Sequence, residues 1–245
     1  MPFTFSHPAI ILPLKCLPTN WFSLTTLIIG SLTPDFEYFI RMKVQSNYSH
    51  TLYGIFWFDL PLAILLSYIF HNLVRNALFF NSPNIIKSRI LIFNHFNWNY
   101  YFKKNWLVVI ISALIGIASH LFWDGFTHNH GYFVNEISEL RNTCSIFGSE
   151  VPVWKITQHL STLIGALIII LSFLKLPKNA IPKSVIDKKY WIIISILIFL
   201  ISILRFLFKV KSINSGNIIV TVISAFLISL AITPILIKSN RSEKF

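Results

Sequence analysis

The sequence predicts an all-α integral membrane protein: a bundle of about five spanning helices preceded by a re-entrant or broken N-terminal segment. Three observations carry this prediction. Of the 245 residues, 54% are hydrophobic and only 12% are charged, whereas a soluble domain has about 25% charged residues. The mean hydropathy of +0.65 indicates more apolar surface than a water-soluble core of this length can bury. Five apolar stretches are also long enough to cross a bilayer, which takes about 20 residues.

The five stretches follow one another without a soluble linker, which predicts a single membrane domain over residues 1–245. They cover residues 52–74, 107–123, 156–174, 191–208 and 218–237. Two shorter apolar pieces precede them, one broken by Pro13 and Pro18 and the other spanning 22–32. Neither piece is long enough to cross alone. Together they are compatible with a re-entrant hairpin, an interfacial hairpin or one broken crossing.

The distribution of Lys and Arg predicts the orientation in the membrane. The connections 75–106 and 175–190 and the tail after residue 237 carry thirteen of these residues, and the opposite connections carry six. By the positive-inside rule, the first set lies in the cytoplasm. The C-terminus is therefore expected to be cytoplasmic, and the segments 35–51 and 125–155 are expected to share the outer face.

Composition also excludes other classes of protein. The net charge of +12 and pI of 9.8 come from basic residues scattered between apolar blocks, so we expect no nucleic-acid partner. The two cysteines, Cys16 and Cys144, exclude a disulfide framework and a thiolate zinc cage and leave a single disulfide open. The N-terminus lacks the basic start and cleavage site of a signal peptide, so His7 is expected in the mature protein.

Polar residues that are rare in apolar segments gather in three clusters, the later two of which are predicted to lie at the outer face. The clusters contain Ser6 and His7; Asp35, Glu37 and His50; and His120, Asp124 and His128. A single histidine at a membrane interface is usually a polar anchor or a helix cap. The gathering of histidines with carboxylates is what favours a functional site.

Two of these clusters have the spacing of a metal site. His120 and Asp124 are four residues apart and share one helix face, about 6 Å from each other. Asp35 and His50 flank a short outer loop, so both can lie at the same depth. A carboxylate at membrane depth costs several kcal/mol unless it is paired. Imidazole and carboxylate ligands suit zinc, manganese or iron, and such an ion can turn a bound water into a hydroxide nucleophile.

Three further residues are candidates for the same site. His128 falls near the same stripe if the helix continues past Gly125. Glu37 is either a second acid beside the metal ligands or a solvated partner for Arg41. His159 opens a spanning helix on the outer side and can also approach the site.

At these residues the chain resembles a family of bacterial polytopic membrane proteins, domain of unknown function 4184. The resemblance lies in residues 1–8, MPFTFSHP, in 34–38, PDFEY, in 49–52, SHTL, and in the block 120–130. It extends to about Leu174. The family has no established activity, so the resemblance implies a bacterial cytoplasmic membrane and no more about function.

More distantly, the order of these motifs is similar to that of the membrane-bound metal-dependent hydrolases of bacterial inner membranes. That similarity implies the metal ligands His7, Asp35, His50, His120 and Asp124, with His128 a further ligand or proton carrier. The chain lacks the extra histidine that this group has upstream of His50, which favours one ion over two. It also implies that residues 8–33 return to the outer face as a hairpin.

The leading hypothesis is a membrane metallohydrolase with its site at the outer face. A divalent ion would activate water, Glu37 or His128 would move protons, and the substrate would be amphiphilic, such as a lipid or phosphate ester. The alternatives are a transporter or channel, to which Asp59 and His71 point, and a bis-histidine haem protein, against which the acidic neighbours argue. Whether the protein is an enzyme and how it oligomerises stay open at this point.

Overall fold

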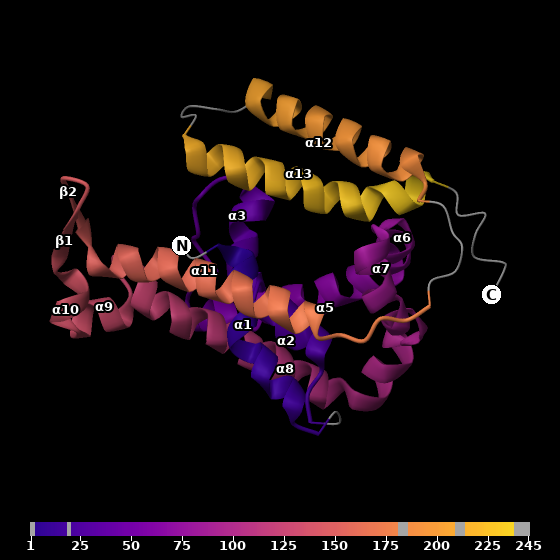
Figure 1. Ribbon diagram of the computed structural model, residues 1–245, viewed down its shortest axis with the longest axis horizontal. Coiled ribbons are helices and arrows are strands. Elements are labelled where there is room, and N and C mark those ends of the chain that lie inside the picture. The colour runs from indigo at the N-terminus through magenta and orange to yellow at the C-terminus, as the bar shows by residue number, and fades with distance from the viewer. Residues whose placement is uncertain (1–2, 19–20, 181–185, 209–213, 238–245) are drawn as a thin grey trace. The chain divides into compact units, whose positions relative to one another are not determined.

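The computed structural model describes residues 3–18, 21–180, 186–208 and 214–237, and these residues are mostly helical (Figure 1). Five helical stretches are long and apolar enough to cross a membrane: Leu52–Asn81, Trp98–Glu136, Val153–Leu174, Lys188–Phe208 and Ser215–Leu236. The predicted all-α fold with five spanning helices is therefore confirmed, and the protein is an integral membrane protein. The second stretch begins nine residues earlier than its apolar core suggests, because its first turns carry Tyr and Lys.

The helices and strands have the following bounds. They are α1 (Pro8–Ile11), α2 (Leu24–Gly30), α3 (Phe36–Arg41), α4 (Leu52–Gly54), α5 (Leu60–Ile69), α6 (Arg75–Asn81), α7 (Asn84–Ile90), α8 (Trp98–Thr127), α9 (Tyr132–Glu136), α10 (Ser138–Arg141), β1 (Thr143–Ile146), β2 (Ser149–Pro152), α11 (Val153–Leu174), α12 (Lys188–Phe208) and α13 (Ser215–Leu236). Strands β1 and β2 form an antiparallel hairpin.

Two helices depart from regular geometry at identifiable residues. A π-helical turn, Ile55–Asp59, joins α4 to α5 and ends two residues before Pro61, which has no N–H to donate to the preceding turn. Helix α8 is kinked at Asn105, whose φ is −128°. The helix therefore forms a widened turn on the N-terminal side of Pro61.

The chain forms two compact units, and it passes between them several times. The first unit contains Met1–Asp35, Tyr48–Ile64 and Phe102–Leu176, and the second contains Phe36–Asn47, Leu65–Tyr101 and Pro177–Phe245. In the second unit α12 packs along α13 (Figure 1). The Asn217 side chain, near the start of α13, accepts a hydrogen bond from the backbone N–H of Val44 at 2.9 Å.

The N-terminal segment of the first unit turns back on itself. Helix α1 packs against both α2 and α11. His7, before α1, and Asp35, after α2, both lie beside the same end of α8: the His7 Nε2 is 3.5 Å from Asp124, and the Asp35 Oδ1 is 3.6 Å from His120. The hairpin return expected for residues 8–33 is therefore observed, and it leaves five spanning helices.

Small residues let α2 and α8 pack closely. A Cβ added to Gly30 would lie 2.5 Å from the carbonyl oxygen of Ala113, and one added to Gly116 would lie within 3 Å of the backbone of α2. Such contacts between small residues are typical of helix pairs in membranes. The close approach brings the carbonyl of Ser31, one residue past α2, to the side chain of His120.

Candidate metal centre

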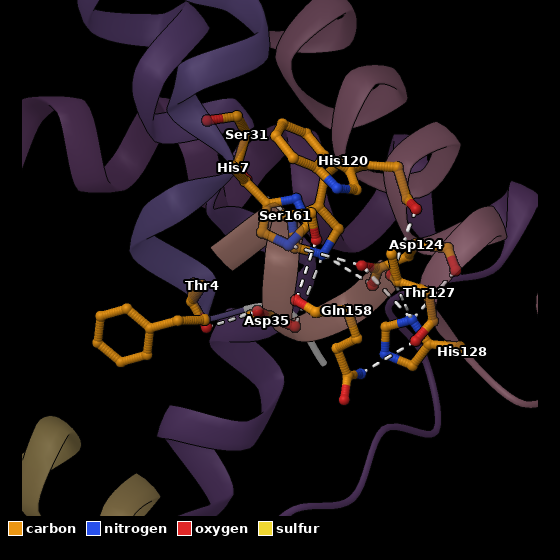
Figure 2. Close-up of polar contacts among 12 residues, drawn as sticks. Thr4, His7, Ser31, Asp35, His120, Asp124, Thr127, His128, Gln158 and Ser161 are labelled. Atoms are coloured by element: carbon orange, nitrogen blue, oxygen red, sulfur yellow. Dashed lines mark hydrogen bonds and ion pairs between the residues drawn. The ribbon is translucent and has the colours of Figure 1, made fainter. Parts of the chain in front are cut away.

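The His and Asp residues singled out from the sequence converge in the first unit from separate segments (Figure 2). His120 and Asp124 lie one turn apart on α8. The others are His7, directly before α1, Asp35, at the end of the turn Thr33–Asp35, and His50, directly before the Thr51 cap of α4. The hairpin of α1 and α2 supplies two of them from its two ends. This convergence could not be read from spacing alone.

Four of these side chains form a compact group. One donor atom from each of Asp35, His50, His120 and Asp124 lies within 4.8 Å of the other three. The His120 Nε2 is 3.6 Å from the Asp35 Oδ1 and 3.3 Å from the Asp124 Oδ2. The His50 Nε2 is 3.7 Å and 3.4 Å from the same two oxygens. Two imidazoles therefore alternate with two carboxylates around one point.

These separations match those of ligands around one metal ion. Ligand atoms held about 2.0–2.2 Å from a tetrahedral ion lie roughly 3.3–3.6 Å from each other. Charge-assisted hydrogen bonds between nitrogen and carboxylate are shorter, about 2.7–2.9 Å. The four separations between 3.3 and 3.7 Å fit an ion shared by all four groups better than direct hydrogen bonds.

Burial strengthens this reading. Asp35 and His120 are fully buried, and Asp124 is 6% exposed. Among the described residues, no hydrogen bond is made to the His120 Nε2, the Asp35 Oδ1 or either carboxylate oxygen of Asp124. Buried polar atoms without partners cost several kcal/mol, and buried charges cost more. A divalent cation would supply a partner to all of these atoms at once.

Hydrogen bonds outside the cluster hold its ligands in a metal-binding orientation. The His120 Nδ1–H donates to the carbonyl oxygen of Ser31 at 2.8 Å, so a neutral ring, as in a metal complex, would carry its lone pair on Nε2, the atom that faces the carboxylates. The hydroxyl of Thr4 donates to the Asp35 Oδ2 at 2.5 Å and leaves Oδ1 directed at the cluster. Such supporting bonds are typical of metal-binding histidines and carboxylates.

His50 is held in an unusual backbone conformation. Its φ is +62°, in the left-handed region that residues other than glycine seldom adopt. Its Nδ1 lies 3.1 Å from the Ser49 hydroxyl. The next residue, Thr51, caps α4 by accepting a hydrogen bond from the N–H of Gly54 at 2.9 Å. Strained backbone concentrates at functional sites, and here it directs the Nε2 of His50 into the cluster.

His7 lies against the cluster and completes the five predicted ligands. Its ring stacks on that of His120, with centroids 3.7 Å apart and planes at 14°, and its Nε2 is 3.5 Å from the Asp124 Oδ1. Burial, reinforced by the neighbouring His120, lowers the pKa of His7 from 6.5 to about 3. The ring is therefore neutral at pH 7, as a metal ligand must be.

Asp35 is a carboxylate under the same conditions. Burial by itself raises the pKa of Asp35, but the adjacent His120, and to a smaller extent His50, lower it by more than burial raises it. The net effect holds the pKa of Asp35 below its usual value.

Contacts with α11 fix the position of His7. The Ser6 hydroxyl donates to the carbonyl oxygen of Thr162 at 3.1 Å, and the Phe3 N–H donates to the Thr162 hydroxyl at 3.1 Å. Gly165 faces this segment, because a Cβ there would lie 2.9 Å from the Ser6 Cβ. The N-terminal residues are thus bound to a spanning helix directly before His7.

The two predicted proton carriers have different surroundings. The His128 ring is partly exposed, and its Nδ1 lies 3.5 Å from the Asp124 Oδ1 and 3.1 Å from the Asp124 carbonyl oxygen. Glu37 belongs to the second unit, where its carboxylate pairs with Arg41 at 2.7 Å and accepts the N–H of Asn47 at 2.9 Å. A role for Glu37 or His128 in proton transfer stays a prediction.

The remaining histidines of interest lie outside the group of four donors. His159 and His130 are exposed. His71 stacks on Trp98 in the second unit, with ring centroids 4.9 Å apart. Two supporting residues, Thr4 and Ser31, were missed by the sequence reasoning. Thr4 had one signal, its place in the opening motif three residues before His7, whereas Ser31 acts through its backbone and leaves no signal in the side-chain pattern.

Comparison with known families agrees with the resemblance seen in the motifs. The family model described as Domain of unknown function (DUF4184) matches residues 1–235. The match extends beyond Leu174 through both of the last spanning helices. No curated protein and no solved structure matches the chain. A match over nearly the whole length shows that the chain belongs to the DUF4184 family.

Proposed function

We propose that this protein is a membrane metal-dependent hydrolase whose divalent ion is held by Asp35, His50, His120 and Asp124. The observation that carries the proposal is the convergence of these four donor atoms within 4.8 Å, at separations suited to one ion. The mixed nitrogen and oxygen donors suit zinc, manganese or iron. The side chains also fit such an ion in protonation, because the bond from His120 to Ser31 leaves Nε2 free to bind it.

The residues of the cluster would have different roles in hydrolysis. When bound, a divalent ion supplies a Lewis acid that lowers the pKa of water toward neutrality and polarises an ester or phosphoryl oxygen. Asp35 and His120 are buried and hold one side of the cluster rigidly. The His128 side chain is 30% exposed beside Asp124, so it is the group best placed to move a proton between the site and its surroundings.

A cavity beside the cluster supports an amphiphilic substrate. It has a volume of about 550 Å³ and an almost entirely apolar lining that includes Ile10, Phe122, Trp123 and Phe126. Trp123 directly precedes Asp124, and its ring meets that of His7 edge to face at 5.7 Å. An apolar cavity lined by Trp123, the residue next to Asp124, suits a hydrocarbon chain whose ester or phosphoester group would reach the ion.

The charge distribution supports the location of this site. In the connections expected from the sequence, thirteen Lys and Arg residues lie on one side and six on the other, and by the positive-inside rule this favours the outer face for the cluster. On this proposal the protein acts at the outer face of a bacterial cytoplasmic membrane, with its C-terminus in the cytoplasm.

The test is hydrolysis by the purified protein in mixed micelles supplied with zinc or manganese. Long-chain phosphoesters and carboxylic esters are compared with short-chain, water-soluble analogues. We expect hydrolysis that is lost in Asp124→Ala and unchanged in His159→Ala, an exposed histidine outside the cluster. Ile10→Trp, which fills the cavity, should reduce turnover of long-chain substrates more than that of short-chain ones. Hydrolysis that persists in Asp124→Ala, or metal-dependent solute flux in liposomes without hydrolysis, would contradict the proposal.

A further inference from the structure

Asp124 presents its two carboxylate oxygens to two different sets of nitrogen atoms. Its Oδ2 faces the His50 and His120 Nε2 atoms, at 3.4 and 3.3 Å. Its Oδ1 faces the His7 Nε2 and the His128 Nδ1, each at 3.5 Å. These two contacts with Oδ1 have about the same length as the two with Oδ2, and that length is the one expected between ligands of one ion.

We propose that a second divalent ion binds between His7, Asp124 and His128, with the Asp124 carboxylate bridging the two ions. This inference rests on the proposed function for the first ion. Its ligands are the His7 Nε2, the Asp124 Oδ1 and the His128 Nδ1. Three protein ligands leave positions for water or for substrate oxygens, as in catalytic sites.

The stacked histidines give the spacing of the two ions. The rings of His7 and His120 are nearly parallel, 3.7 Å apart, and each directs its Nε2 at one oxygen of Asp124 (Figure 2). An ion bound in line with each ring would lie about one ring separation from the other. Pairs of catalytic metal ions are roughly 3.5–4 Å apart, so the stacking distance is the one that a two-metal site requires.

The surroundings of His7 suit a metal ligand. It is 1% exposed, and among the described residues neither of its ring nitrogens makes a hydrogen bond. The contacts of Phe3 and Ser6 with Thr162 on α11 hold it in this position. Two contacts in the second ligand set compete with an ion for the His128 Nδ1: the Asp124 carbonyl oxygen, at 3.1 Å, and the Thr127 hydroxyl, at 3.4 Å. Because the His128 ring is partly exposed, a small rotation frees this nitrogen for the ion.

This assignment changes the role of His128 and the expected number of ions. His128 becomes a ligand in place of a proton carrier. The sequence favoured one ion because the histidine expected upstream of His50 is absent. The second ion needs no such residue, because His7 arrives from the N-terminal hairpin.

The test is the number of ions bound, measured by titrating metal-stripped, detergent-purified protein with Zn²⁺ and, separately, with Mn²⁺. We expect two Zn²⁺ per chain in the wild type and in His159→Ala, one in His7→Ala and in His128→Ala, and none in Asp124→Ala. His7→Gln gives a second version of the first variant if alanine impairs folding. With two Mn²⁺ per chain, the wild type should give the electron paramagnetic resonance spectrum of a coupled pair.

The possible outcomes distinguish a failure of the second ion site from a failure of the proposed function, which depends on the first ion. A wild type that saturates at one ion per chain, with that ion lost in His50→Ala, would overturn the second site and leave the first intact. Two ions retained in both His7→Ala and His128→Ala, or two uncoupled Mn²⁺ signals, would also overturn it. A protein that binds no ion would overturn both proposals.

Discussion

His120 donates its Nδ1 hydrogen to the carbonyl oxygen of Ser31 over 2.8 Å, and this bond joins the fold to the chemistry of the cluster. It forms because α2 and α8 approach closely at Gly30 and Gly116. It fixes the tautomer of the imidazole, so that the lone pair on Nε2 faces the carboxylates of Asp35 and Asp124. The helix packing therefore prepares a metal ligand that the chain could not orient through α8 alone.

The Thr4 hydroxyl should matter to metal affinity more than to stability. Its bond to the Asp35 Oδ2 orients the opposite oxygen toward the cluster, and loss of such a supporting bond costs about 10–100-fold in affinity. We expect this loss of Zn²⁺ affinity in Thr4→Val, measured by competition with a chelating dye. Thr4→Ser keeps the hydroxyl and should bind as the wild type does. Equal affinity in all three proteins would show that the Thr4–Asp35 bond has no such role.

Substitutions of His50 should affect stability and metal binding differently. Its left-handed φ of +62° is tolerated by Asn and is strongly disfavoured for β-branched residues, at a cost of about 1–2 kcal/mol. In chelator, we expect His50→Asn to unfold at the same temperature as the wild type or higher, and His50→Val to unfold at a lower one. Both variants should lose the first ion, which His50 binds. Equal midpoints for the two variants would contradict the strain argument.

Removal of metal should destabilise the protein. An ion that binds only the folded state stabilises it by about 2.7 kcal/mol when free metal is at 100 times the dissociation constant. We expect chelator to lower the thermal midpoint of the wild type in detergent, and re-added Zn²⁺ to restore it. Asp124→Asn preserves the size of the side chain but removes its charge, so its midpoint should respond to neither treatment. A wild-type midpoint that ignores both chelator and Zn²⁺ would argue against a bound ion.

Gly165 should be required for the position of His7. A Cβ at this residue would lie 2.9 Å from the Ser6 Cβ and 3.0 Å from the Ser6 carbonyl oxygen, so a larger side chain displaces the N-terminal segment from α11. Gly165→Val should therefore lower the number of bound Zn²⁺ ions from two to one, and Gly165→Ala should weaken the second ion to a smaller extent. Two ions held with unchanged affinity by Gly165→Val would show that this contact does not position His7.

The spanning helices and most of the donor atoms could be predicted from the sequence, because both depend on local patterns. Long apolar stretches must cross the bilayer as helices, and the spacing of His120 and Asp124 places both on one helix face. The partners of these residues depend on tertiary packing. The stacking of His7 on His120 requires the hairpin to return to the end of α8, and one-dimensional patterns offered three arrangements for that segment. For Glu37 the sequence allowed a second acid beside the metal ligands or a partner for Arg41, and its carboxylate does pair with Arg41.

The supporting contacts were the least accessible to sequence reasoning. Ser31 contributes only a backbone carbonyl to His120, and any residue in that position would supply the same group. The left-handed conformation of His50 is likewise set by the turn that leads into α4 and not by the residue type.

The central claim is that the His and Asp cluster holds a divalent ion, and metal content tests it most directly. Elemental mass spectrometry on detergent-purified protein compares the wild type with Asp124→Ala and with Asp187→Ala, an aspartate of the second unit outside the cluster. The account predicts zinc, manganese or iron in the wild type and in Asp187→Ala, and none in Asp124→Ala. A wild type that contains no metal and takes up none on reconstitution, or an Asp124→Ala protein with full metal content, would contradict it.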